Sequence, residues 1–132
     1  MARAPHFLRP LLSAAPAGLC LRNRRTGQVL ASTLLPALDS TSRKTGLLKH
    51  AALADGEAMV IAPSNAVHTW FMKFDLDLVF VRRDGQVVKT RAAVKPWRMS
   101  GALRAFAVIE MRAGTLAARE TLPGDVLEVV AA

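Results

Sequence analysis

The chain has 132 residues, the length of one domain, and its 52% hydrophobic and 21% charged residues are typical of a globular protein rather than a disordered one. Its single cysteine, Cys20, excludes an internal disulfide and a metal site built from cysteines. The net charge is +8, but residues 1–50 carry +7 of it and residues 51–132 only +1, which indicates loose attraction to polyanions rather than a dedicated partner.

Residues 1–17 are predicted to form a flexible N-terminal extension, and residues 18–132 a single β-rich domain. Two arginines and an Ala-Pro-Ala sequence give the extension some likeness to a signal peptide, but Pro10 interrupts its short apolar stretch. A cytoplasmic location is therefore expected, with export through a short signal as the alternative. No apolar run reaches the roughly 18 residues of a transmembrane segment, so none is predicted.

Short apolar runs at residues 19–22 and 28–31 flank a loop that contains glycine, and together they predict a β-hairpin. Residues 33–37 are also apolar, but Pro36 interrupts them. The Ser-Thr-Ser sequence that follows offers N-caps for a short helix over residues 43–48.

Strands dominate the rest of the chain. Residues 76–81 alternate and are rich in β-formers, an Asp-Gly turn follows, and residues 86–90 return, which predicts a second hairpin. Other segments are expected to be strands at 57–62, 106–111 and 126–130, a loop at 93–101, and one or two helical turns at 115–120. The predicted class is mainly β: a small barrel or sandwich-like antiparallel domain with one or two short helices.

One segment carries a family resemblance. From His68 to Phe80 the chain reads His-Thr-Trp-Phe-Met-Lys-Phe-Asp-Leu-Asp-Leu-Val-Phe. This progression resembles that of a widespread prokaryotic family, domain of unknown function 192, with Asp75 where proline is usual. Further segments resemble the family in order and spacing at residues 43–48, 95–98, 108–114 and 124–125. The resemblance implies a compact barrel or sandwich-like β domain with small helical elements, and it implies no established activity.

Asp77 and Glu110 each interrupt an apolar strand, and a buried carboxylate is costly unless it has a partner. The two acids could form an acid/base pair, with His68 as a general base or proton shuttle. Alternatively they are structural, and either cap backbone N–H groups or pair with Arg43. We expect Arg43 to form a charge-assisted link to one of them.

Aromatic residues are concentrated in the same motif. Trp70, Phe71, Met72 and Phe74 can all belong to the core, and strand alternation would place Trp70 and Met72 on the face opposite Phe71. Both faces of one strand cannot easily be dry in so small a domain, so one aromatic is expected to cover a loop or line a groove. Trp97, between basic residues in a loop, is a second candidate for the surface.

Basic residues follow the 76–90 hairpin and the next loop at Arg82, Arg83, Lys89, Arg91, Lys95 and Arg98. With Trp97 they could form a platform for single-stranded nucleic acid, where charges track phosphates and rings stack on bases. One stacking ring is thin support, and a charged edge strand explains the same residues. No specific nucleic acid is therefore expected.

The sequence has no phosphate loop, zinc signature, nucleophile elbow or dinucleotide fingerprint, so no catalytic residue, metal or cofactor is predicted. The favoured interpretation is a non-catalytic binding module for a small ligand or peptide. Its predicted groove is bordered by His68, Met72, Asp77, Trp97, Arg98 and Glu110. A small enzyme using Asp77 or Glu110 with His68, and a weak single-strand nucleic-acid binder, are the alternatives.

Overall fold

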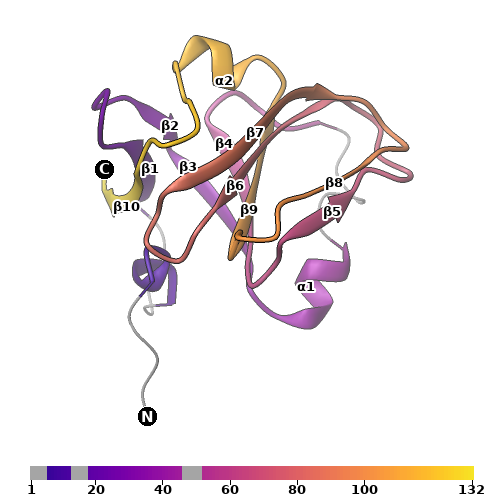
Figure 1. The fold of residues 1–132 in the computed structure, drawn as a ribbon, viewed down its shortest axis with the longest axis horizontal. Helices are drawn as coiled ribbons and strands as arrows, with labels where there is room; N and C mark the ends of the chain where they lie inside the picture. Colours follow the sequence, from indigo (N-terminus) through magenta and orange to yellow (C-terminus); the bar gives the residue numbers. More distant parts are fainter. Residues whose placement is uncertain (1–5, 13–17, 46–51) are drawn as a thin grey trace.

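The computed structural model of the chain describes residues 6–12, 18–45 and 52–132 (Figure 1). In chain order the elements are η1 (Arg9–Leu12), β1 (Leu19–Asn23), β2 (Val29–Ala31), β3 (Thr33–Ala37), α1 (Ser40–Thr45), β4 (Glu57–Ile61), β5 (Ala66–His68), β6 (Leu76–Val81), β7 (Val87–Val94), β8 (Met99–Gly101), β9 (Ala107–Arg112), α2 (Thr115–Ala118) and β10 (Leu127–Ala131).

The strands form three sheets. The largest has the order β3-β4-β9-β6-β7, a second has the order β10-β1-β2, and the third is the β5–β8 ribbon. All pairs are antiparallel except β3 with β4, which run parallel. The mainly β class with two short helices is confirmed. Within the described residues the strands do not close into a barrel, so that part of the prediction is wrong, because the strands divide among separate sheets.

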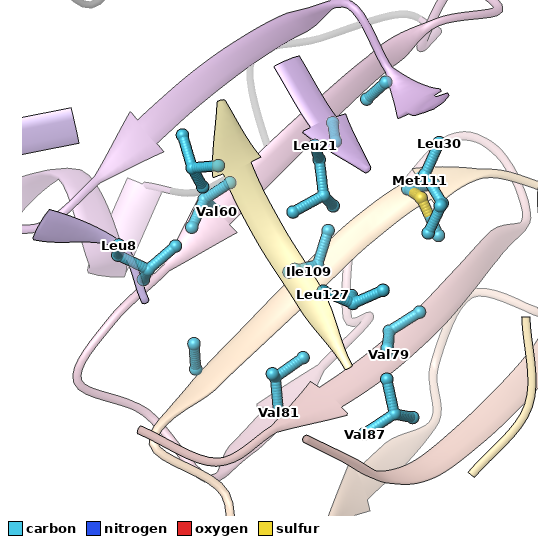
Figure 2. Packing of buried hydrophobic residues seen from close by; sticks show 14 of the residues in the cluster. Leu8, Leu21, Leu30, Val60, Val79, Val81, Val87, Ile109, Met111 and Leu127 are labelled. Carbon is cyan, nitrogen blue, oxygen red and sulfur yellow. The ribbon is translucent and has the colours of Figure 1, made fainter. Parts of the chain in front are cut away.

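The first hydrophobic core lies between the three-stranded sheet and one face of the five-stranded sheet. Leu21 and Leu127 come from the smaller sheet, and Val60, Val79 and Ile109 from the larger one. Figure 2 shows these side chains meeting between the two layers. Burial of this apolar surface is the main source of stability for the two layers.

The second hydrophobic core lies on the opposite face of the five-stranded sheet. Leu78, Phe80 and Val108 point into it from β6 and β9, and Met72 joins them from the segment before β6. The half-buried Val67 of β5 packs against the same cluster. The second core therefore supports the β5–β8 ribbon and the segment that follows it.

Both predicted hairpins are confirmed, as β1–β2 and β6–β7, and so are the strands that became β4, β9 and β10. The predicted loop at 93–101 is shorter, since β7 continues to Val94 and β8 begins at Met99. Residues 33–37 form edge strand β3, a position that tolerates Pro36. The predicted helix begins earlier, at Ser40, and residues 46–48 lie outside the described residues.

Residues 6–12 belong to the folded domain. Phe7 N donates to the carbonyl of Arg83 at 2.8 Å, and Leu11 N donates to Leu8 O at 2.9 Å. In such a 3₁₀ turn residues three apart lie on one side, so Leu8 and Leu11 both enter the first core. The prediction of a flexible extension is wrong for this stretch, because a single helical turn is too short to show a periodic pattern of apolar residues in the sequence.

We expect Leu8→Ala to lower the free energy of unfolding by about 2–5 kcal/mol, since Leu8 is fully buried and truncation leaves a cavity. Leu12→Ala, at a position 60% exposed in the same turn, should change it by no more than about 0.5 kcal/mol. Urea unfolding of both variants measures the difference, and equal midpoints would show that residues 6–12 add nothing to stability.

Candidate functional site

The chain leaves β5 through a tight turn over Thr69–Met72. Met72 N donates to Thr69 O at 3.2 Å, and Phe71 has a φ of +64°. A type II turn has positive φ at this third position and usually carries glycine or asparagine there. The segment is not an extended strand, so the predicted alternation of Trp70 and Met72 against Phe71 is wrong. Trp70 and Phe71 are exposed, and Met72 is buried in the second core.

Thr69 fastens a distant loop to this turn. Its hydroxyl is buried, donates to Lys95 O at 2.7 Å and accepts from Arg98 N at 2.9 Å. In the main chain, Thr69 N donates to Arg98 O at 2.8 Å, and Trp97 N donates to Thr69 O at 3.0 Å. The His-Thr and Pro-Trp-Arg segments, 29 residues apart in sequence at Thr69 and Arg98, are therefore joined.

The two joined segments present an aromatic surface, which we define as His68, Trp70, Phe71, Trp97 and Met99. The rings of His68 and Trp70 have centroids 4.8 Å apart, and those of Phe71 and Trp97 meet edge to face at 4.7 Å. Met99 is the β8 partner of His68 in the ribbon. Figure 1 shows the β5–β6 and β7–β8 connections together at the right-hand end of the molecule, away from β1 and β10.

Two members of the aromatic surface have strained backbones. Phe71 and Trp97 have φ values of +64° and +66°, in the left-handed region that bulky residues rarely adopt. Such conformations cost about 1–3 kcal/mol each. The side chains are 67% and 57% exposed, so core packing does not repay that cost. The main-chain hydrogen bonds to Thr69 hold the backbone of the turn and of the 95–98 loop in these conformations, which places both rings at the surface.

Basic side chains surround the aromatic surface. Lys73, Arg91, Lys95 and Arg98 are all exposed. The nearest acid in sequence is Asp75, whose carboxylate lies 3.7 Å from Lys95 Nζ. The surface therefore combines exposed rings with an excess of positive charge.

A second, shallow feature lies where the β6–β7 turn meets the loop after β8. Arg82, Arg83, Asp84 and Arg104 line one cleft of about 510 Å³. An adjoining cleft of about 420 Å³ shares Arg83 and Arg104 and is also lined by Asn65. Arg82 and Asp84 are paired at 2.6 Å. These clefts carry more positive than negative side chains.

Asp77 is a structural residue. Its buried carboxylate accepts hydrogen bonds from three backbone N–H groups, those of Ala93 at 2.8 Å, Gly114 at 3.0 Å and Leu116 at 2.9 Å. These bonds tie β6 to the end of β7 and to the start of α2. The carboxylate is therefore satisfied without an arginine.

The predicted ion pair of Arg43 with Asp77 or Glu110 is wrong. Arg43 Nη1 donates to the carbonyls of Leu38 at 3.1 Å and Ala62 at 3.5 Å. The guanidinium thus donates to main-chain oxygens beside α1. At Asp77, backbone N–H groups are the donors in place of the predicted arginine.

Glu110 is buried on β9 with apolar neighbours. Its register partners on the adjacent strands are Met59 and Leu78, both in the second core. Among the described residues, none forms a hydrogen bond or an ion pair with its carboxyl group. Burial raises the pKa of Glu110 from its ordinary value of 4.5 to about 7.

The two acids lie on opposite faces of the five-stranded sheet. Asp77 is paired with Met111, which enters the first core, whereas Glu110 is paired with Leu78, which enters the second. Directly opposite residues on antiparallel strands share a face. The predicted acid/base pair of Asp77 and Glu110 is therefore not formed.

The six residues of the predicted groove separate into two groups. His68, Trp97 and Arg98 lie exposed at the aromatic surface, whereas the rest are buried at Met72, Asp77 and Glu110. Sequence reasoning missed the role of Thr69 and the exposure of Met99. No glycine or proline marks the Thr69–Met72 turn, so its exposed rings carried no local signal.

Three further findings concern metal ligands, membrane-spanning helices and the cysteine. Among the described residues, no cluster of three or more His, Cys, Asp or Glu side chains could hold a metal ion. No helix in the described part of the chain is long and apolar enough to cross a membrane. Cys20 is buried in β1.

Comparison with known proteins places the chain in a family. Residues 21–129 match the model of DUF192, described as an uncharacterized ACR. The chain belongs to the DUF192 family. The match includes the Thr69–Met72 turn, the 95–98 loop and both acids, so the aromatic surface lies inside the family domain.

Solved structures share the DUF192 fold of this chain. One is a protein of unknown function from Novosphingobium aromaticivorans, with 24% identity, a TM-score of 0.72, and coverage of 83% of this chain and 82% of that chain. Another, a candidate transcription regulator from Sinorhizobium meliloti, has 21% identity, a TM-score of 0.73, and coverage of 84% and 91%. At these identities the likeness shows the fold alone. No curated protein matches the chain.

In this DUF192 chain, Asp77→Ala should lower the free energy of unfolding by about 3 kcal/mol or more. The change leaves three N–H groups without their acceptor, and each unsatisfied buried group costs about 1–3 kcal/mol. Asp75→Ala is the matched control, since its loose pair with Lys95 is worth less than about 1 kcal/mol. Urea unfolding compares the two, and similar losses would contradict the structural role of Asp77.

The buried carboxyl group of Glu110 should make the free energy of unfolding depend on pH. Its folded-state pKa is raised, so between pH 4.5 and about 7 the folded chain holds a proton that the unfolded chain has lost. Stability from this group therefore falls as pH rises through that window and is constant above it. Glutamine does not titrate, so the free energy of unfolding of Glu110→Gln should rise relative to that of wild type as pH increases. We expect this difference to change by up to about 3 kcal/mol from pH 4.5 to 7.5 in urea unfolding.

The matched control is Glu128→Gln, whose difference from wild type should stay nearly constant from pH 4.5 to 7.5 and should change with the opposite sign below pH 4.5. Hydrogen bonding to Arg22 lowers the pKa of Glu128, so wild type should gain on this variant as pH rises toward 4.5. A difference between Glu110→Gln and wild type that does not change from pH 4.5 to 7.5 would refute the buried, neutral carboxyl group.

Proposed function

We propose that this DUF192 protein is a non-catalytic binding module whose partner docks on the aromatic surface. One observation carries the proposal: Phe71 and Trp97 hold left-handed backbone conformations while their rings remain exposed. Strain of this kind persists only where the surrounding structure imposes it, and it is concentrated at functional sites.

The alternative explanation for exposed aromatics is that they merely cover the loops beneath them. A sequence selected for stability alone would place glycine or asparagine at these two positions, because both adopt positive φ readily. The bulky rings cost stability on both counts, as strained backbone and as apolar surface in water. Retention of strained or exposed groups against stability is typical of binding sites.

Catalysis is less well supported than binding. Asp77 is satisfied by backbone N–H groups and Glu110 lies on the other face of the sheet, so the acids do not converge. His68 stacks on Trp70 at the surface and makes no hydrogen bond to either acid among the described residues. The geometry that an acid/base mechanism needs is therefore lacking in this set.

Phe71→Asn tests the proposal through both stability and binding. Asparagine tolerates the left-handed backbone, and the lost ring is 67% exposed, so the free energy of unfolding should stay within about 1 kcal/mol of wild type or rise. Binding should weaken. The chain has two tryptophans and no tyrosine, and both indoles belong to the aromatic surface, so intrinsic fluorescence reports on it alone.

The measurement is a fluorescence titration with small molecules, peptides and oligonucleotides, each checked by calorimetry. Ligands that bind should change tryptophan emission in wild type and bind Phe71→Asn more weakly. Leu122→Asn is the control, since Leu122 is 56% exposed in the turn before β10 and should leave binding unchanged. Calorimetric binding with no change in emission and no loss in Phe71→Asn would refute this location of the site.

A further inference from the structure

We infer that the partner of the aromatic surface is a single-stranded nucleic acid. Bases would stack on Trp70, Phe71 and Trp97, and phosphates would meet the basic side chains around them. This inference rests on the proposed function and names the class of partner for the same site.

The first support is the charge of the segment that carries both the aromatic surface and the arginine-lined clefts. Residues 66–105 contain eight Lys or Arg residues and three acids, although the whole of 51–132 has a net charge of only +1. Of the acids, Asp77 is buried, Asp84 is paired with Arg82, and Asp75 lies near Lys95. Little negative charge in this segment therefore remains to oppose a polyanion.

The second support is the arrangement of the basic groups. Lys89 Nζ donates to Gly101 O at 2.8 Å, and Arg91 Nη1 approaches Met99 O at 3.5 Å. The side chains of Lys89 and Arg91, which both belong to β7, therefore lie along β8. That strand spans three residues, or roughly 10 Å.

The β5–β8 ribbon connects the aromatic surface with the arginine-lined clefts. At its far end, Ala102 N donates to Asn65 O at 2.8 Å, and Asn65 lines the cleft that Arg83 and Arg104 share. Basic groups thus continue from Arg98 along the ribbon to this cleft. Such a track is what a nucleic-acid backbone requires.

The third support is the number and the arrangement of the rings. In sequence, Trp97 stood alone, whereas in the fold it contacts Phe71, and Trp70 lies in the same turn. Exposed ring faces suit planar bases, because stacking on an aromatic ring is tolerant of base identity. Duplex DNA keeps its base faces stacked inside, so a single strand is favoured.

The experiment uses the full chain and fluorescein-labelled 12-nucleotide oligomers of mixed sequence, as single-stranded DNA, single-stranded RNA and the matched DNA duplex. Anisotropy and tryptophan emission are recorded between 50 and 200 mM NaCl. We expect the single strands to quench tryptophan and to bind at least about tenfold more tightly than the duplex. If three or four phosphates are contacted, log K against log salt should have a slope of about −2 to −3.

Variants separate stacking from charge. Trp97→Ala should bind at least about tenfold more weakly with an unchanged salt slope, because base stacking is lost. Arg98→Gln should also bind more weakly, but with a slope reduced by about 0.7. Phe71→Asn supports the first result if Trp97→Ala fails to fold. Arg24→Gln is the matched control, since Arg24 is exposed next to β1 in the other sheet and should bind as wild type does.

Several results would overturn the inference. Equal affinity for duplex and single strand would exclude stacking, and an equal loss in Arg24→Gln and Arg98→Gln would show diffuse attraction by the +8 net charge. Anionic phospholipid vesicles and a polyglutamate peptide serve as further probes. If the vesicles or the peptide give a response that depends on Trp97 and the oligonucleotides do not, the nucleic-acid inference fails and the proposed function stands. If no probe does, both fail.

Discussion

The buried hydroxyl of Thr69 bonds to two points of the 95–98 loop, donating to Lys95 O and accepting from Arg98 N. The aromatic surface depends on this pair of bonds, because they hold Trp97 beside Phe71. A hydroxyl can serve both a donor and an acceptor at once, which neither valine nor alanine could do. The second core, which receives Met72 and Val67, gives the turn a fixed base.

The polar residues of the family motifs have different tasks in this chain. Asp77 binds three backbone N–H groups and connects β6 to α2. Asp125 accepts from Asn23 Nδ2 at 2.8 Å and from Arg25 Nε at 2.6 Å, and the bond with Arg25 is the main cause that lowers the pKa of Asp125 to about 2. Both acids hold connections in place. A role in stabilising the fold explains why both acids occur in the motifs. It does not explain the exposed rings.

Strained backbones and a buried carboxyl group are among the features that lower the stability of this fold. Phe71 and Trp97 have strained backbones, and Glu110 is buried without a partner among the described residues. The strained conformations place both rings at the surface, where a partner can contact them. Glu110 remains neutral up to about pH 7, and this limits the penalty of its burial.

The sequence by itself determined the mainly β class, both hairpins and most strand positions, because alternation and Asp-Gly or glycine-containing turns are local signals. It did not determine the sheet order, the donors to Asp77 or the exposure of Trp70 and Phe71. Those depend on contacts between distant segments, such as Asp77 with Leu116, 39 residues away. A carboxylate in an apolar strand shows only that a partner is needed. Whether that partner is an arginine, a backbone N–H or none at all is decided by which segments the folded sheets bring within hydrogen-bond distance.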